Sequence, residues 1–172
     1  QEVMSVEPDI VDAEDVVPDW PIKGEIAFEN ISFAYANDKN IISGLNLKIF
    51  PGETVAFVGE TGVGKTTVAN MLLRFYEPDR GKITIDGIDI KKIRQKHLHE
   101  SIGLVQQDVF LFSDSVYNNI AFGKPAAAAE EVKEAAVMAA ADSFIEELPQ
   151  KYETEIGERG VKISGGQRQR IA

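Results

Sequence analysis

The fold is decided by the stretch Gly59-Glu60-Thr61-Gly62-Val63-Gly64-Lys65-Thr66-Thr67. Its first eight residues match the pattern G-x-x-x-x-G-K-[ST] of a loop that binds phosphate. A short apolar run at residues 55–58 precedes the loop, and residues 68–76 after it have helical spacing, with Val68, Met71, Leu72 and Phe75 on one face. The order of strand, loop and helix predicts one unit of an α/β domain, with the loop at the carboxyl end of the strand.

The residue types in this stretch suit a polyphosphate ligand. Glycine lets the backbone turn tightly enough to point its N–H groups inward, and the following helix directs its N-terminal dipole at the same place. Lys65 can supply positive charge to the β- and γ-phosphates, and the Thr66 hydroxyl can ligate Mg²⁺. We therefore expect residues 59–67 to bind ATP with Mg²⁺; the alternative is a glycine-rich turn with a surface lysine. The absence of an Asn-Lys-x-Asp tetrapeptide argues against a guanine nucleotide.

Composition limits the other classes of function. The 172 residues carry a net charge of −10 and contain no cysteine, so they predict neither a disulfide framework nor a thiolate metal site. They contain no run rich in Lys and Arg, which argues against a nucleic-acid partner. The most apolar stretch, residues 135–141, is much shorter than the ~20 residues that a membrane helix needs.

Hydrophobic periodicity places the remaining elements. Strands are expected at residues 26–35, with a bulge near Asn30, and at residues 41–50, 55–58, 82–86 and 102–105. Helices are expected at residues 68–76, at 113–122 with Ser113 and Asp114 as caps, at 127–148, and from Ser164 onward. The predicted fold class is α/β: a P-loop NTPase core with an antiparallel β subdomain and a helical subdomain at residues 107–163, incomplete at the C-terminus.

The ends of the chain differ from its middle in composition. Residues 1–24 are rich in Asp and Glu and have no Lys or Arg before Lys23, so they are expected to form an extended, solvated acidic linker.

His97 and His99 are spaced by two residues, which does not bring both to one side of a helix. We interpret them as solvated rather than as metal ligands.

A second motif is Ile163-Ser164-Gly165-Gly166-Gln167-Arg168-Gln169-Arg170. It closely resembles the signature L-S-G-G-Q-x-Q-R of ATP-binding-cassette (ABC) proteins, and the chain resembles the nucleotide-binding domain of ABC exporters of the multidrug and lipid type. The alternative is a flexible loop capped by Ser164. By this resemblance, residues 164–167 bind the nucleotide held by the phosphate loop of a partner domain. Ser164 and Gly166 contact its γ-phosphate.

Three further segments match ABC exporters. Tyr35 stands where the family places the aromatic ring that stacks on adenine. Gln107 stands where a glutamine touches Mg²⁺ and the attacking water, although Gln106 competes for that role. Residues 154–160 resemble the loop that contacts the transmembrane domains, and this feature favours an exporter over an importer.

The resemblance extends from about residue 24 to the end of the sequence. It implies that residues 1–24 link an upstream transmembrane domain to a nucleotide-binding domain at residues 25–172, on the cytoplasmic face of the membrane. Two such domains, identical or different, would couple ATP binding and hydrolysis to export. A soluble ABC ATPase without a membrane part and a non-catalytic ATP-binding module remain the alternatives.

The family pattern continues past the signature with an aspartate, a glutamate and a histidine that serve hydrolysis, whereas the sequence ends at Ala172. We therefore expect these 172 residues by themselves to bind ATP weakly, to hydrolyse it negligibly and to expose apolar surface.

Overall fold

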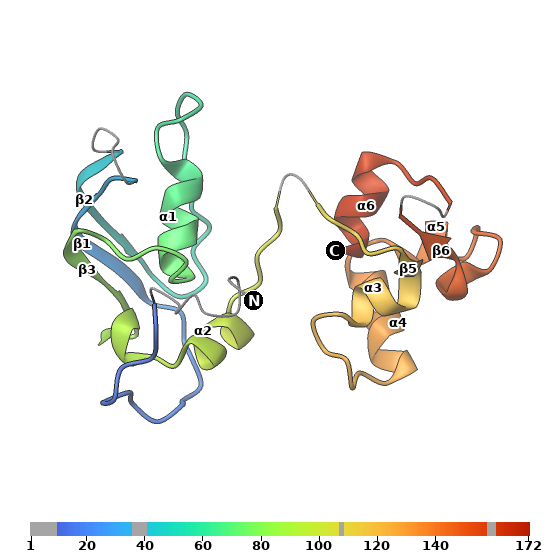
Figure 1. Cartoon of the computed structure of the whole chain (residues 1–172), viewed down its shortest axis with the longest axis horizontal. Coiled ribbons are helices and arrows are strands. Elements are labelled where there is room, and N and C mark those ends of the chain that lie inside the picture. Colours follow the sequence, from blue (N-terminus) through green and yellow to red (C-terminus); the bar gives the residue numbers. More distant parts are fainter. Residues whose placement is uncertain (1–9, 36–40, 107–108, 158–160) are drawn as a thin grey trace, which may run out of the picture. The chain divides into compact units, whose positions relative to one another are not determined.

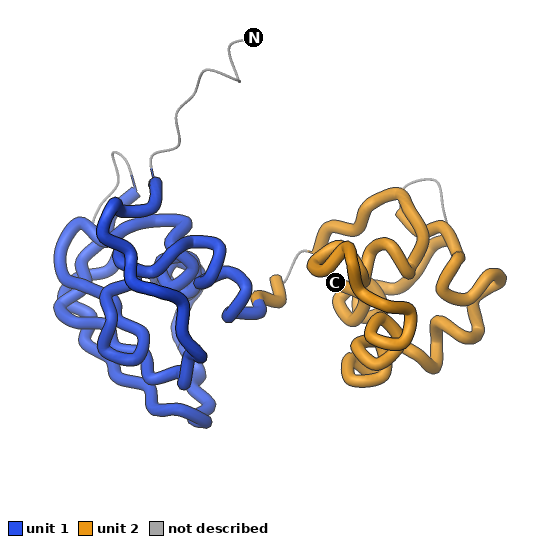
Figure 2. The backbone as a smooth tube through the Cα atoms, turned by 90° about the horizontal axis from the view of Figure 1, so that it is seen from below, with its two compact units in different colours: residues 1–103 blue, residues 104–172 orange. Residues whose placement is uncertain are grey.

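The computed structural model describes residues 10–35, 41–106, 109–157 and 161–172. The chain divides into two compact units, Gln1–Gly103 and Leu104–Ala172, which Figure 2 draws in blue and orange. Each unit has its own hydrophobic core. In the described residues, no helix combines the length and the apolar character needed to cross a bilayer.

Unit 1 is built on a four-stranded antiparallel sheet in the order β2-β1-β3-β4 (Figure 1). The strands are β1 (Ile26–Phe33), β2 (Ile42–Ile49), β3 (Arg80–Ile85) and β4 (Ile88–Asp89).

The bulge predicted near Asn30 is confirmed by the structure. The register of β1 shifts between Phe28 and Ile31, and Asn30 has a φ of 51°. Because side chains alternate along a strand, the extra residue lets both Phe28 and Ile31 face the core, where both are buried.

Three helical elements cover the inner face of this sheet: α1 (Lys65–Leu72), the 3₁₀ turn η2 (Ile90–Lys92) and α2 (Gln95–Ser101). Helix α1 begins and ends earlier than the predicted helix at residues 68–76. It stops at Leu72 because Arg74 adopts a φ of 55°, and the buried Arg74 guanidinium then donates to the carbonyls of Ile90 and Ile93. Phe75, expected on the packed face of the helix, is instead 49% exposed.

Two predicted strands, residues 55–58 and 102–105, are wrong. Both segments are short apolar runs, but in the described part of the chain neither pairs with another strand. A strand requires a hydrogen-bonded neighbour, so the apolar pattern alone does not produce one. Val58 is 93% exposed and Val105 is 69% exposed, which agrees with the expected exposure of apolar surface.

Unit 2 contains a short two-stranded ladder and several helices. Its elements are β5 (Asp114–Ser115), α3 (Val116–Ala121), α4 (Ala129–Met138), α5 (Asp142–Ile145), the 3₁₀ turn η3 (Lys151–Glu153), β6 (Glu155–Ile156) and α6 (Gly165–Ile171). They enclose a core formed by Val116, Ala136, Ala141, Ile145, Ile156 and Ile171.

The helices of unit 2 differ from prediction in two places. The single helix expected at residues 127–148 is divided into α4 and α5, because Ala140 adopts a φ of 53° and turns the chain so that Ala141 and Ile145 both enter the core. The cap of α3 is Ser115 rather than Ser113 or Asp114, since its Oγ accepts from the Asn118 N–H at 3.1 Å.

Residues 10–24, the N-terminal strap, form no helix or strand and none of them is buried, as expected of a solvated segment, but they lie along the surface of unit 1. The Val17 N–H donates to the Lys92 carbonyl at 2.9 Å. Ion pairs join Asp15 to Lys92 at 2.9 Å and Asp19 to Arg94 at 3.1 Å. Two acidic residues of the strap, Asp15 and Asp19, therefore pair with Lys92 of η2 and with Arg94, which follows η2.

Asp86, in the turn between β3 and β4, holds the carboxyl end of the strap. Its carboxylate accepts four hydrogen bonds, from the Trp20 indole at 3.2 Å and from the backbone N–H groups of Lys23, Gly24 and Glu25 at 2.7, 3.1 and 3.0 Å. Burial alone would raise the pKa of Asp86, but these hydrogen bonds outweigh it and hold the pKa below its ordinary value of 3.8.

The two histidines differ in their exposure to solvent. The His99 Nε2 atom lies 2.8 Å from the Leu73 carbonyl oxygen. The His97 ring packs 5.3 Å from the Trp20 ring, and its Nε2 atom is buried without a hydrogen-bond partner. The interpretation as solvated is therefore wrong for His97, which is half-buried beneath the Trp20 ring of the strap, whereas His99 is exposed as expected.

We expect the strap to detach when Asp86 loses its charge. A carboxyl group whose pKa is lowered by folding stabilises the folded arrangement above its unfolded pKa, and this stability is lost as the pH falls through the lower folded value. Trp20 is the single tryptophan of the 172 residues, so its fluorescence reports the strap. Acidification below the ordinary value of 3.8, or Asp86→Ala at neutral pH, should shift its emission to the red.

The matched control is Asp89→Ala, which removes a neighbouring carboxylate that accepts from the Lys91 N–H instead of from the strap. An Asp86→Ala protein whose emission at neutral pH equals that of the wild type and of the control would show that the carboxylate does not hold the strap.

Candidate nucleotide-binding site

The phosphate loop, residues 59–66, leads from residues 55–58 into the first turn of α1. Gly62 and Gly64 have φ values of 89° and 91°, in the left-handed region that glycine adopts without strain. A Cβ atom on Gly64 would also lie 2.9 Å from the Ile41 side chain. The course of the backbone therefore requires glycine at position 64, as the motif predicts, and also favours it at position 62, which the motif leaves open.

Lys65 bends back over the loop. Its Nζ atom donates to the carbonyl oxygens of Gly59 at 2.8 Å and of Glu60 at 2.7 Å. The ammonium group consequently lies against the loop, near the N-terminus of α1, which also provides positive potential. This arrangement can attract a phosphate group.

The two threonines after Lys65 differ in environment. Thr66 is exposed in the first turn of α1, whereas Thr67 is 5% exposed and its Oγ1 atom lies 3.0 Å from the Tyr35 hydroxyl. One exposed hydroxyl suits Mg²⁺, which in nucleotide sites takes few protein ligands and keeps water and phosphate oxygens. The second predicted ligand, Gln107, lies outside the described residues.

Tyr35 belongs to an aromatic cluster of Phe33, Tyr35 and Tyr76. The Tyr35 ring lies 4.9 Å from the Phe33 ring at 87° and 5.0 Å from the Tyr76 ring at 83°. Sequence reasoning singled out Tyr35 but missed Tyr76, because it assigned Phe75 to the packed face of a longer helix. The sequence does show two adjacent aromatic residues, Phe75 and Tyr76, as candidates for this contact. Because α1 ends at Leu72, Tyr76 is the one whose ring packs on Tyr35.

The signature motif, residues 163–170, lies in unit 2 and opens α6 as predicted. The Ser164 Oγ accepts from the Gln167 N–H at 3.2 Å, and the Gln167 side chain accepts from the Ser164 N–H at 2.8 Å, which is a capping box. Ser164, Gly165 and Gly166 are exposed. The Ser164 hydroxyl keeps its own proton, so it can still donate to an anion.

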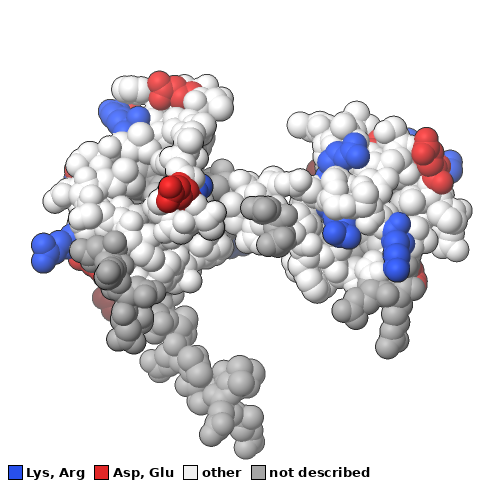
Figure 3. All heavy atoms as spheres, turned by 90° about the horizontal axis from the view of Figure 1, so that it is seen from above, with Lys and Arg blue, Asp and Glu red and all other residues white. Residues whose placement is uncertain are grey.

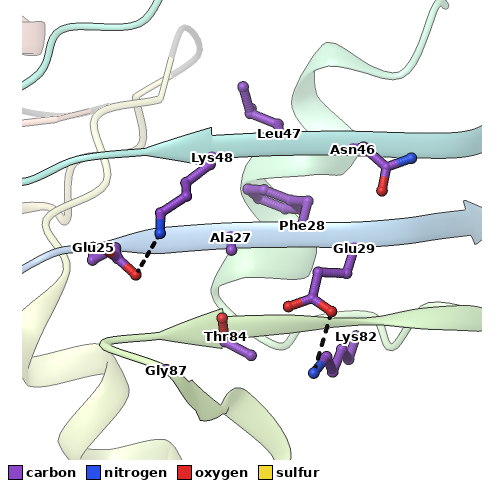
Figure 4. Close-up of a pocket in the computed structure, with 10 residues that line it drawn as sticks. All are labelled: Glu25, Ala27, Phe28, Glu29, Asn46, Leu47, Lys48, Lys82, Thr84 and Gly87. Atoms are coloured by element: carbon purple, nitrogen blue, oxygen red, sulfur yellow. Dashed lines mark ion pairs between the residues drawn. The ribbon is translucent and has the colours of Figure 1, made fainter.

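A hollow of about 470 Å³, which no residue of the phosphate loop lines, lies over the outer face of the sheet (Figure 4). Its lysines are already paired, Lys48 with Glu25 at 3.1 Å and Lys82 with Glu29 at 3.2 Å. Because a glutamate already balances the charge of each lysine, this hollow does not favour the binding of a polyphosphate. On the face drawn in Figure 3, the described Lys and Arg side chains also lie as separate groups among other residues, unlike the basic stripe of a nucleic-acid-binding protein.

The comparison with known proteins agrees with both motifs. The profile of the family described as ABC transporter matches residues 42–172, which include the phosphate loop and the signature motif. The chain belongs to the ABC transporter family. It resembles the ATP-binding domain of exporter-type members in sequence and fold.

Two curated relatives and one solved structure show the extent of the match. The chain is 46% identical over 171 residues to the uncharacterized ABC transporter ATP-binding protein YwjA of Bacillus subtilis (strain 168), covering 99% of this chain and 30% of that protein. It is 53% identical over 151 residues to a putative multidrug export ATP-binding/permease protein of Staphylococcus aureus (strain NCTC 8325 / PS 47), covering 87% and 26%.

The solved structure is that of a bacterial Atm1-family ABC exporter with ATP bound. It matches with a TM-score of 0.91 and 41% identity, over 99% of this chain and 30% of the exporter chain. The ABC domain described here therefore spans less than a third of the length of these ABC proteins.

Lys65→Ala should weaken ATP binding roughly ten- to a hundredfold, because a charge-assisted contact is worth about 1.5–3 kcal/mol. Titration calorimetry with Mg²⁺ and ATP measures this affinity directly. Lys82→Ala serves as the matched control, since it removes a lysine that is paired with Glu29 on the outer face of the sheet. An unchanged ATP affinity in Lys65→Ala would contradict the assignment of the loop.

Proposed function

We propose that residues 59–67 bind Mg·ATP and that the protein carrying this ABC domain couples ATP binding and hydrolysis to export across a membrane. The observation that carries the proposal is the Lys65 ammonium, bonded to the Gly59 and Glu60 carbonyls over a loop of left-handed glycines. Membership of the ABC transporter family and the similarity to a putative multidrug export protein of Staphylococcus aureus support it.

Each part of the site has a distinct role in this proposal. The loop N–H groups and Lys65 bind the β- and γ-phosphates, and Tyr35 stacks on adenine. Thr66 and Gln107 would hold Mg²⁺, which when bound neutralises charge that develops on the phosphates. The exposure of Thr66 in the first turn of α1 supports this role.

The signature motif serves the nucleotide of a second domain. Ser164 can donate its hydroxyl proton to a γ-phosphate while it caps α6, and Gly165 and Gly166 permit close approach. ATP held between the phosphate loop of one domain and the signature motif of another favours the closed pair, because only the closed state makes both sets of contacts. The second domain is either an identical copy or a homologue.

The relatives support a wider assembly. A relative is described as an ATP-binding/permease protein, which supports a transmembrane domain joined to this domain through residues 1–24, at the cytoplasmic face of the membrane. That transmembrane domain selects the exported substrate.

Gly166→Ala tests the signature motif without disturbing the fold. Nothing lies within 4 Å of a Cβ atom on Gly166, and alanine favours a helix over glycine by about 1 kcal/mol, so stability should be equal or greater. The added methyl group would displace the γ-phosphate of the opposing domain. We expect ATP hydrolysis by the intact protein to fall roughly a hundredfold while ATP affinity changes little.

Gly123→Ala is the control, because it is also a glycine of unit 2 with nothing within 4 Å of the added Cβ atom, and it lies outside the signature motif. If Gly166→Ala hydrolyses ATP as fast as this control, Gly166 does not face a phosphate group.

A further inference from the structure

The aromatic cluster is fixed to the body of unit 1 by two independent elements. Phe33, the last residue of β1, is buried, and the Tyr35 and Tyr76 rings both pack on it at 4.9 and 5.6 Å. Tyr76 reaches this position because Arg74 leaves the helical conformation and buries its guanidinium. Tyr76 therefore comes from the segment after α1, whereas Tyr35 comes from the end of β1.

The hydroxyl of Tyr35 provides a third point of attachment. It lies 3.0 Å from the Thr67 Oγ1 atom, and Thr67 is buried two residues after Lys65. A buried hydroxyl is almost always hydrogen-bonded, so this contact ties Tyr35 to the same helix that carries Lys65. The Tyr35 ring remains partly exposed beside that helix.

We propose that Tyr76 is a positioning residue that holds the Tyr35 ring in place to stack on the base of a nucleotide whose phosphates occupy the loop. This inference rests on the proposed binding of ATP. The near-perpendicular packing of Tyr76 on Tyr35, at 83°, is a favoured geometry for aromatic pairs and restricts rotation of the Tyr35 side chain. A ring that is already oriented loses less conformational freedom when a base stacks on it.

The measurement is titration calorimetry of the purified protein that carries these residues, in Mg²⁺, with ATP and with inorganic tripolyphosphate. Tyr76→Ala should weaken ATP binding about three- to tenfold, as expected for the loss of one aromatic contact. Tripolyphosphate has no base, so its affinity should not change. Tyr76→Phe keeps the ring and should restore ATP affinity to within about twofold of the wild type.

Two further variants separate positioning from a general effect. Phe75→Ala is the matched control: this ring is the direct neighbour in sequence, but it lies 5.6 Å from the His99 ring instead of contacting Tyr35. It should leave the affinity for ATP unchanged. In a Tyr35→Ala background, Tyr76→Ala should cause no further loss of ATP affinity, because Tyr76 acts through Tyr35.

The outcomes are distinct. A wild-type protein that binds neither ATP nor tripolyphosphate overturns the proposed function and the inference with it. If the wild type binds both, an unchanged ATP affinity in Tyr76→Ala overturns the inference alone. The inference is also overturned by equal losses for ATP and tripolyphosphate, which indicate a structural role, and by additive losses in the double variant.

Discussion

The contact of the Lys65 ammonium with the carbonyl oxygens of Gly59 and Glu60, at 2.8 and 2.7 Å, is the interaction on which the site depends. It ties the start of the loop to the first turn of α1, so that the ammonium group and the N-terminus of α1 both provide positive potential beside the loop. The two acceptors are uncharged carbonyls, so an anionic phosphate can compete for the same ammonium group with a stronger, charge-assisted bond. The loop can therefore exchange the contacts of the Lys65 ammonium with these carbonyls for a contact with an anionic ligand.

The rest of unit 1 keeps α1, and with it the loop, in place. The inner face of the sheet packs on Val68 and Met71 of α1. At the other end of the helix, the Arg74 guanidinium donates to the Val11 carbonyl of the strap at 3.1 Å and to Glu77 at 3.0 Å. The strap, the sheet and the aromatic cluster therefore all contact one short helix or the residues that follow it, and each restrains the position of the loop.

Local patterns in the sequence predicted the parts of the structure that local physics determines. The turn of the phosphate loop and the cap at Ser164 depend on residues within one or two turns of each other. What the sequence did not show involves distant partners: residues 55–58 have no ladder neighbour in the described chain, and residues 10–24 lie against η2. Tyr76 was missed for the same reason, because its role depends on where α1 ends.

Backbone hydrogen exchange with and without Mg·ATP tests the central claim most directly, because the account assigns phosphate binding to the N–H groups of the loop. We predict that ATP slows exchange at residues 59–67 and leaves the outer strand residues around Lys48 and Lys82 unchanged. Exchange that is unaltered in the loop at saturating ATP, or slowed only over the outer face of the sheet, would contradict the account.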